Sequence, residues 1–362
     1  MAPPAGDPRR PEPIDWRLAE RVAGKIAGRD AFADSYLAGS LRPNFAAATA
    51  EAEAAVAEYT GLHSPDRATA EVVDRAEWVS ANVRSMRRML EPLTERVGEK
   101  MARSALAPVG RRVAGTELGV LLGYVAQRVL GQYDLLVPDE DGAPTDDRVY
   151  YVGANILALE KRFAFRPADF RLWIALHEVT HRAQFTGVPW LREYFLAQVH
   201  ELVGSIEPDP GLIFAAIGRA ADEIRHGRSP VGERGLVGLL GTPEQQLAMD
   251  RMQALMSLLE GHGNAVMNQL GARMLDGQER MASVLSARRT TRGATAVLHR
   301  LIGLEMKMRQ YEVGEAFVEA VTQEAGFRAL DAAWQGPEYL PTLPELTAPT
   351  DWLDRVGRVL AS

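Results

Sequence analysis

The chain has 362 residues, of which 46% are hydrophobic and 25% charged, as in an ordinary globular protein with a sizeable core. Its net charge of −7 and isoelectric point near 5.6 argue against a nucleic-acid partner, because nucleic-acid binding usually needs a basic surface. The sequence has no cysteine, which excludes disulfides and thiolate metal ligands. Any metal would therefore have to be bound by His, Asp or Glu.

The chain begins with "MAPPAGDPRRPEP", which is rich in Pro and Arg and lacks the apolar stretch of a secretion signal. We expect residues 1–13 to form a disordered tail. The most apolar later segment starts at Val113, and Glu117, Gln127 and Arg128 interrupt it, so we predict no membrane span. These features, together with the lack of cysteine, fit a cytoplasmic protein.

Residues 14–132 have the pattern of packed helices. The segment "NFAAATAEAEAAVAEYTGL" is rich in Ala and ends at Gly61. The segment "RAEWVSANVRSMRRMLEPL" has apolar residues at helical spacing. Neither segment carries a cluster of chemically active residues. We expect a helical N-terminal region, which is either separate from the rest of the chain or continuous with it.

The pattern changes after residue 132. Two runs rich in β-branched and aromatic residues, "YDLLVP" and "RVYYVGANI", flank the turn-rich segment "DEDGAPTDD". We interpret them as a hairpin, or as two neighbouring strands joined by a loop. They lie directly before the next predicted helix, so this small β element is expected to stand beside that helix.

A helix is predicted over residues 167–186, with Pro167 in its first turn and Gly187 just past its end. It contains the sequence HEVTH, a match to the HExxH pattern of zinc hydrolases. His177 and His181 are four residues apart, so both rings leave the same helix face. Glu178 is turned by about 100° from His177, where a carboxylate can act on a water as general base. The alternative is a pair of core histidines satisfied by hydrogen bonds.

A catalytic zinc ion usually has three protein ligands, so the third must come from a later segment. The segment "SLLEGHGNAVMN" offers Glu260 and His262, which point about 200° apart on a helix and are not both expected to bind one metal. We favour Glu260, because a carboxylate in so apolar a segment needs a partner. A salt bridge to arginine is the alternative. His262 is either the ligand in its place or a residue that hydrogen-bonds an oxyanion or a carboxylate at the site.

Three segments together resemble the "type 2" family of zincin-like metallopeptidases: "FRLWIALHEVTHRAQFTGVPWLREYF", "LLEGHGNAVMN" and "GLEMKMRQYEVGEAFVEAV". This family is also labelled as associated with the biosynthesis of a deazaflavin cofactor. The resemblance runs from about Gly131 to "WQGPEYLPTLPEL", roughly two-thirds of the chain. It implies a zincin fold and a zinc hydrolase, and it implies no particular substrate.

In zincins, a strand before the motif helix commonly forms one wall of the cleft. The resemblance therefore implies this role for residues 148–156, with a free edge that faces the substrate. Gly153 would let a substrate backbone approach, and Asn155 would hydrogen-bond it; an ordinary buried strand is the alternative. Tyr311 is our candidate for stabilising an oxyanion. The alternative for Tyr311 is a place on the solvated face of an amphipathic helix.

We thus predict a mainly α-helical protein in which residues 133–362 form a zincin-like catalytic region with a small β-sheet or hairpin before the HExxH helix. We expect a zinc-dependent hydrolase that acts on a peptide or protein, with Glu178 as general base. One alternative is a non-catalytic helical protein, stabilised by zinc, that acts in an assembly. Another is a zinc hydrolase of a non-peptide amide.

Overall fold

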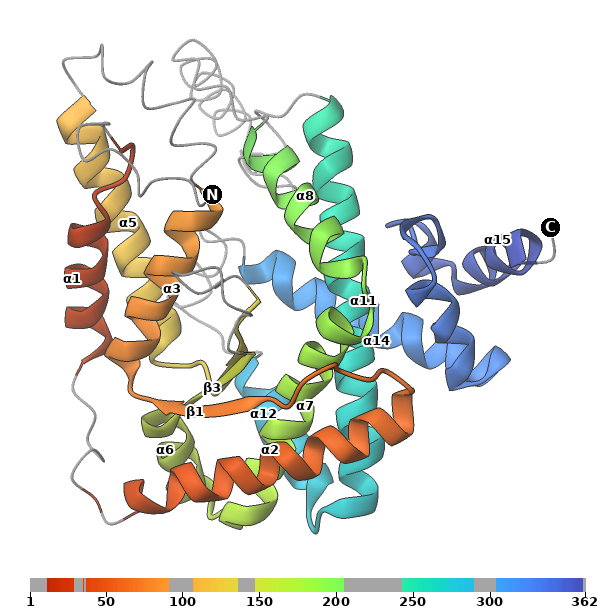
Figure 1. Cartoon of the computed structure of the whole chain (residues 1–362), viewed down its shortest axis with the longest axis horizontal. Helices are drawn as coiled ribbons and strands as arrows, with labels where there is room; N and C mark the ends of the chain where they lie inside the picture. Colours follow the sequence, from red (N-terminus) through yellow and green to blue (C-terminus); the bar gives the residue numbers. More distant parts are fainter. Residues whose placement is uncertain are drawn as a thin grey trace, which may run out of the picture. The chain divides into compact units, whose positions relative to one another are not determined.

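The structure is a computed structural model that describes residues 12–28, 35, 37–90, 107–135, 147–204, 243–289 and 304–360. Most of these residues are helical, and a few short strands form one small sheet (Figure 1). The predicted mainly α-helical fold with a small sheet is therefore confirmed. Of the predicted tail, residues 1–11 lie outside the described part of the chain. Among the described residues, no helix is both long and apolar enough to cross a membrane.

Contacts divide the chain into two compact units. One consists of Met1–Arg192 and His262–Arg288, and the other consists of Glu193–Gly261 and Arg289–Ser362. Helix α11 (Pro243–Met274) is continuous and contributes residues to both. The first unit includes both the predicted N-terminal helical region and the helix of the HExxH motif. The division expected after residue 132 stays a prediction.

The sheet of the first unit has the strand order β1-β3-β2. Strand β3 (Arg148–Val152) pairs in parallel with β1 (Thr69–Val73) and antiparallel with β2 (Gly131–Tyr133). The antiparallel pair agrees with the expectation of two neighbouring strands before the motif helix, but β2 lies earlier than expected and shares only Tyr133 with the segment "YDLLVP". Strand β1 lies in the region that we expected to be mostly helical, and we did not predict a strand at Thr69–Val73 from the sequence.

The expectation that residues 148–156 have a free edge is also wrong. Strand β3 is the central strand and is paired on both sides. Gly153 and Asn155 belong to the first turn of helix α6 (Gly153–Phe163), where both pack internally. A Cβ on Gly153 would lie 2.8 Å from the Leu41 side chain. The Asn155 amide donates to the carbonyl oxygens of Ala126 and Val129. These two residues therefore serve the core, as the alternative stated.

Successive side chains of β3 point to opposite faces of the sheet, as the pleat of a strand requires. Tyr150 and Val152 join a hydrophobic cluster with Trp16, Trp78 and Leu122. These three residues come from the helices that cover this face (Figure 1), namely α1 (Trp16–Ala27), α3 (Arg75–Met89) and α5 (Ala107–Ala126).

On the other face, Tyr151 packs against helix α2 (Ala38–Thr60). Its ring stacks on Phe45 with the centroids 3.9 Å apart, and its hydroxyl hydrogen-bonds Thr49 at 2.7 Å. Helix α7 (Pro167–Gly187), which carries the HExxH motif, packs against α2, β2 and β3. The sheet thus separates one helical layer from the layer that holds the motif.

Two buried arginines fix α7 to its neighbours. Arg171 donates to both carboxylate oxygens of Glu160, at 2.7 and 2.9 Å, before the motif. Directly after the motif, Arg182 donates to Glu53 at 2.7 Å and also binds Asp147. Both arginines are at most 2% exposed. Charges so deeply buried are tolerated only when they are paired, so these contacts set the rotation of α7 about its axis.

In the second unit, helix α14 (Leu304–Ala325) packs against the C-terminal segment. The indole of Trp352 contacts the Phe317 ring edge-on and donates to the Tyr339 carbonyl at 2.8 Å. The Pro-rich end forms short 3₁₀ helices followed by a last α-helix: η1 (Phe327–Trp334), η2 (Pro337–Tyr339), η3 (Glu345–Thr347) and α15 (Pro349–Leu360).

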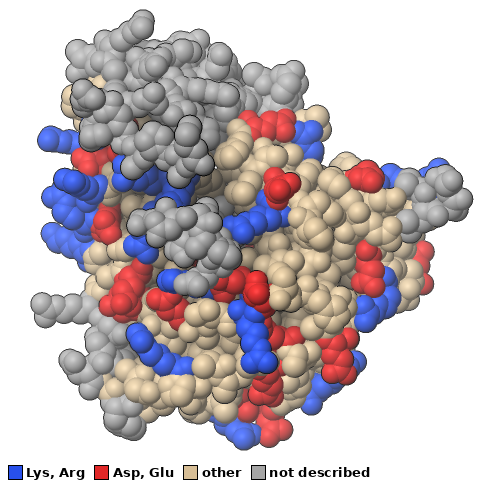
Figure 2. All heavy atoms as spheres, in the orientation of Figure 1, with Lys and Arg blue, Asp and Glu red and all other residues tan. Residues whose placement is uncertain are grey.

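The remaining described helices are α8 (Leu191–Gly204) and α12 (Gln278–Arg289). Charged side chains are found on the exterior. On the face drawn in Figure 2, basic and acidic residues are interspersed with uncharged ones. The paired charges that flank the motif are instead inside the protein, which separates their role from that of the solvated surface charges.

Helices α11 and α14 touch at glycines, which yields a test of the fold. A Cβ on Gly314 would lie 1.9 Å from the carbonyl oxygen of Ser257. We expect Gly314→Ala to lower the free energy of unfolding by roughly 1–3 kcal/mol, because the backbone cannot yield without moving a helix. Chemical denaturation measures this change.

The matched control is Gly357→Ala on α15, where a Cβ would meet nothing within 4 Å. Alanine is the better helix former, so we expect a gain of about 0.5–1 kcal/mol. Equal stability of the two variants would contradict the close contact between α11 and α14.

Candidate metal centre

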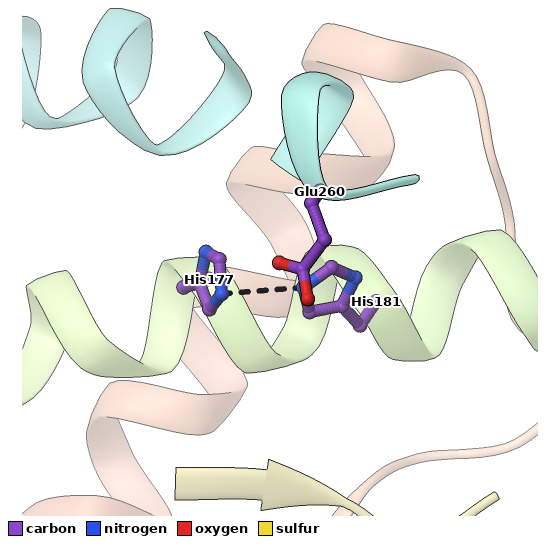
Figure 3. A group of neighbouring side chains, drawn as sticks. All are labelled: His177, His181 and Glu260. Carbon is purple, nitrogen blue, oxygen red and sulfur yellow. Dashed lines mark hydrogen bonds between the residues drawn. The ribbon is translucent and has the colours of Figure 1, made fainter. Parts of the chain in front are cut away.

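Helix α7 brings the two motif histidines together. Pro167 occupies its first turn with Asp169 beside it, and the helix ends at Gly187. The range agrees with the prediction to within one residue. The Nε2 atoms of His177 and His181 lie 3.2 Å apart, and the ring planes are 85° from parallel (Figure 3). Both nitrogens therefore converge on one point, as their spacing on a helix predicts.

Glu260 on α11 completes a group of three possible ligands. One ligand atom from each of His177, His181 and Glu260 lies within 4.8 Å of the others. Figure 3 shows the Glu260 carboxylate directed towards the two rings. Glu260 is 6% exposed. In the described part of the chain, the structure thus groups Glu260, and not His262, with the motif histidines.

These residues fit a zinc ion. Two histidines and one carboxylate are the ligand set of many catalytic zinc sites. Nitrogens at 2.0–2.1 Å from a tetrahedral zinc would lie roughly 3.3 Å from each other. The observed separation of 3.2 Å between the Nε2 atoms agrees with this value. The two histidines thus stand at the spacing that zinc requires.

Glycine keeps α11 close to the histidines. Gly263 follows Glu260 by three residues, so both lie towards the same side of the helix. A Cβ on Gly263 would lie 3.1 Å from Cε1 of His181 and 3.7 Å from Cε1 of His177. A larger residue at this position would therefore push on the ring of a proposed ligand.

Glu178 is buried next to strand β2. It is 8% exposed, and a Cβ on Gly131 would lie 2.6 Å from its Cγ and 2.8 Å from Oε1. The glutamate side chain thus lies across the backbone of Gly131, in space that any other residue would fill. Glu178 follows His177 directly in the motif, and this contact gives its carboxylate a defined place.

His262 lies behind His181 and is linked to it through Gln184. Oε1 of Gln184 is 2.9 Å from Nδ1 of His181, and Nε2 of Gln184 is 2.9 Å from Nδ1 of His262. Burial, with a smaller contribution from His181, lowers the pKa of His262 to about 3. The His262 imidazole is therefore neutral at physiological pH, and its role at the site stays a prediction.

Tyr311, our candidate for stabilising an oxyanion, lies on α14, and its side chain is outside the described part of the chain. Its role stays a prediction. Sequence reasoning assigned no role to Gln184 or Gly131. Gln184 follows His181 by three residues, a spacing that places both on one helix face and is visible in the sequence. No sequence pattern points to the contact of Gly131 with Glu178.

A solved structure is similar to this chain over nearly its whole length. A crystal structure from Chloroflexus aurantiacus, named as that of a "putative hydrolase with a novel fold", superposes with a TM-score of 0.68 at 31% sequence identity. The match covers 95% of this chain and 99% of that one. A comparison with curated protein sequences found no match.

The family comparison covers nearly the whole chain. The model of a family described as zincin-like metallopeptidase matches residues 14–353, which include both motif histidines, Glu178 and Glu260. Such a family implies a zinc hydrolase, in agreement with the ligand set found here. The chain belongs to the family of zincin-like metallopeptidases.

Proposed function

We propose that this protein is a zinc-dependent metallopeptidase that binds the metal through His177, His181 and Glu260. The observation that carries the proposal is the convergence of these three side chains, with the buried carboxylate of Glu178 next to His177 in the motif. The family supports a zinc hydrolase. Its restriction to peptides is our inference from the position of the sheet.

When bound, zinc would supply Lewis acidity, which acidifies water and polarises a carbonyl group. The chain supplies the proton transfers. Glu178 takes a proton from the attacking water and later passes it to the leaving amine. Because its side chain is held against Gly131, the carboxylate needs little reorganisation between these two steps.

The edge of the sheet supports a peptide as substrate. Strand β2 is an edge strand of the described sheet, it packs against α7, and its first residue contacts Glu178. An extended peptide can add to such an edge through backbone hydrogen bonds. We therefore assign to β2 the role that we first expected for residues 148–156, since strand β3 is paired on both sides.

The alternatives differ from this proposal in what they require. A zinc-stabilised protein without activity does not need a general base next to a ligand in the motif, so the buried Glu178 argues against this alternative. A hydrolase of non-peptide amides would use the same residues and would differ only in what binds at β2. Assays on a peptide library and on small amides separate these two hydrolases.

The metal assignment predicts about one zinc per chain in the purified protein. We expect His177→Ala and Glu260→Ala to lose this zinc, because two remaining ligands hold the metal poorly. Elemental analysis after gel filtration measures the content. His200→Ala is the control, since His200 is exposed on α8 and should not affect the zinc. Loss of zinc in His262→Ala, but not in Glu260→Ala, would refute the third ligand.

The general-base assignment predicts that Glu178→Gln keeps the zinc and loses about 10²–10⁴-fold in kcat/KM. The amide has nearly the same shape but cannot accept the proton. The assay uses a peptide that the wild-type protein cleaves. Unchanged turnover by Glu178→Gln would refute the general-base assignment. If the wild-type protein cleaves no member of a broad peptide library, the alternative of a non-catalytic protein in an assembly is favoured.

The contact of Glu178 with β2 predicts that a substitution at Gly131 also lowers activity and leaves the zinc content unchanged. In Gly131→Ala the new methyl group takes the place of the Glu178 side chain, which can move because it is flexible. We expect a loss of activity with zinc content unchanged. Gly24→Ala, where a Cβ meets nothing within 4 Å, is the control. Full activity of Gly131→Ala would show that the placement of Glu178 over β2 is not needed.

A further inference from the structure

Gln184 joins two histidines inside the protein. Its side chain is fully buried on α7, less than one helical turn after His181. Oε1 lies 2.9 Å from Nδ1 of His181, and Nε2 lies 2.9 Å from Nδ1 of His262. A carboxamide accepts through oxygen and donates through nitrogen. The direction of both hydrogen bonds is therefore set by a single orientation of the amide.

The position of His181 selects that orientation. Its Nε2 is directed towards Nε2 of His177, where the ligand atoms gather, so Nε2 must carry the lone pair to bind a metal. The proton of the neutral ring is then on Nδ1, which donates to Oε1 of Gln184. The amide nitrogen of Gln184 in turn donates to Nδ1 of His262, whose own proton is therefore on Nε2.

We propose that Gln184 is a positioning residue that fixes the tautomers of both histidines. It holds His181 in the Nδ1–H form, ready to bind a metal through Nε2, and His262 in the Nε2–H form, as a buried hydrogen-bond donor. The proposal rests on the proposed metal site. The opposite orientation of the amide would place a proton on Nε2 of His181 and block that ligand atom.

The two histidines of the motif then differ. If His181 has the Nδ1–H form in the metal-free protein, its Nε2 accepts the hydrogen bond of 3.2 Å from Nε2–H of His177. For His177 to bind a metal, the Nε2 proton must leave and Nδ1 must take one up, so this ring changes tautomer. His181 keeps its Nδ1 proton throughout. Only one of the two ligands is thus preset before metal binds.

Nitrogen NMR of the zinc-free, full-length protein labelled with ¹⁵N-histidine tests the proposal, because it reports the tautomer of each neutral ring. Spectra of His177→Ala, His181→Ala and His262→Ala assign the signals. We expect Nδ1–H for His181 and Nε2–H for His177 and His262. Added zinc should convert His177 to Nδ1–H and leave the Nδ1 proton of His181 in place.

Two substitutions separate the tautomer effect from a loss of packing. Gln184→Met removes both hydrogen bonds at similar volume, and we expect about a 10–100-fold loss of zinc affinity, typical for the partner of a ligating histidine. Gln184→Glu keeps an acceptor for His181 and loses the donor to His262. We expect it to keep zinc affinity within a few-fold, with His262 switched to Nδ1–H.

The matched control is Thr180→Val on the same helix, because Thr180 is buried and its hydroxyl donates to the Leu176 carbonyl. It should change neither tautomer nor zinc affinity. Nε2–H on His181 in the wild type would overturn the proposal. Equal loss of zinc affinity in Gln184→Glu and Gln184→Met, with His262 still Nε2–H, would also overturn it. A wild type that binds no zinc refutes the metal site, while its zinc-free spectrum still decides the role of Gln184.

Discussion

The structure depends on the burial of a helix that carries several polar and charged side chains. Helix α7 is buried over most of its surface, and yet it carries two arginines, two histidines, a glutamate and a glutamine. Leaving such groups without partners inside a protein costs several kcal/mol each. The surroundings of α7 follow from this cost. Arg171 and Arg182 find carboxylates on neighbouring segments, and Gln184 bonds to two histidines.

The site also requires that backbone segments come close to its side chains. Glycine permits this at positions where a larger side chain would collide. At Gly131 the Glu178 side chain fills the space of the absent Cβ, and at Gly263 the ring of His181 comes near. These contacts position Glu178 and the proposed ligand His181 without a long loop. The site is thus built from regular helices and one short strand, whose backbones are stiff, so its geometry needs little adjustment.

The local part of this arrangement could be read from the sequence, because it lies within single helices. The spacing of His177 and His181 fixes their common face, and the apolar surroundings of Glu260 indicated the carboxylate that the structure groups with them. The parts that depend on distant pairing could not be read. Strand β1 pairs with β3 across Thr69 and Arg148, and no local pattern announces this pairing.

The ion pairs of Arg182 also determine which fragment of the chain retains all the partners of the motif helix. Its guanidinium binds Glu53 on α2 and the Asp66 carbonyl, both far upstream of the motif, while β1 completes the sheet beneath it. A fragment that begins at residue 133 would leave this buried cation short of a carboxylate and β3 short of a neighbour. Because these partners are distant in sequence, the motif helix makes its buried contacts only when the segment from α2 to β1 is present. The smallest unit that keeps these partners therefore includes α2.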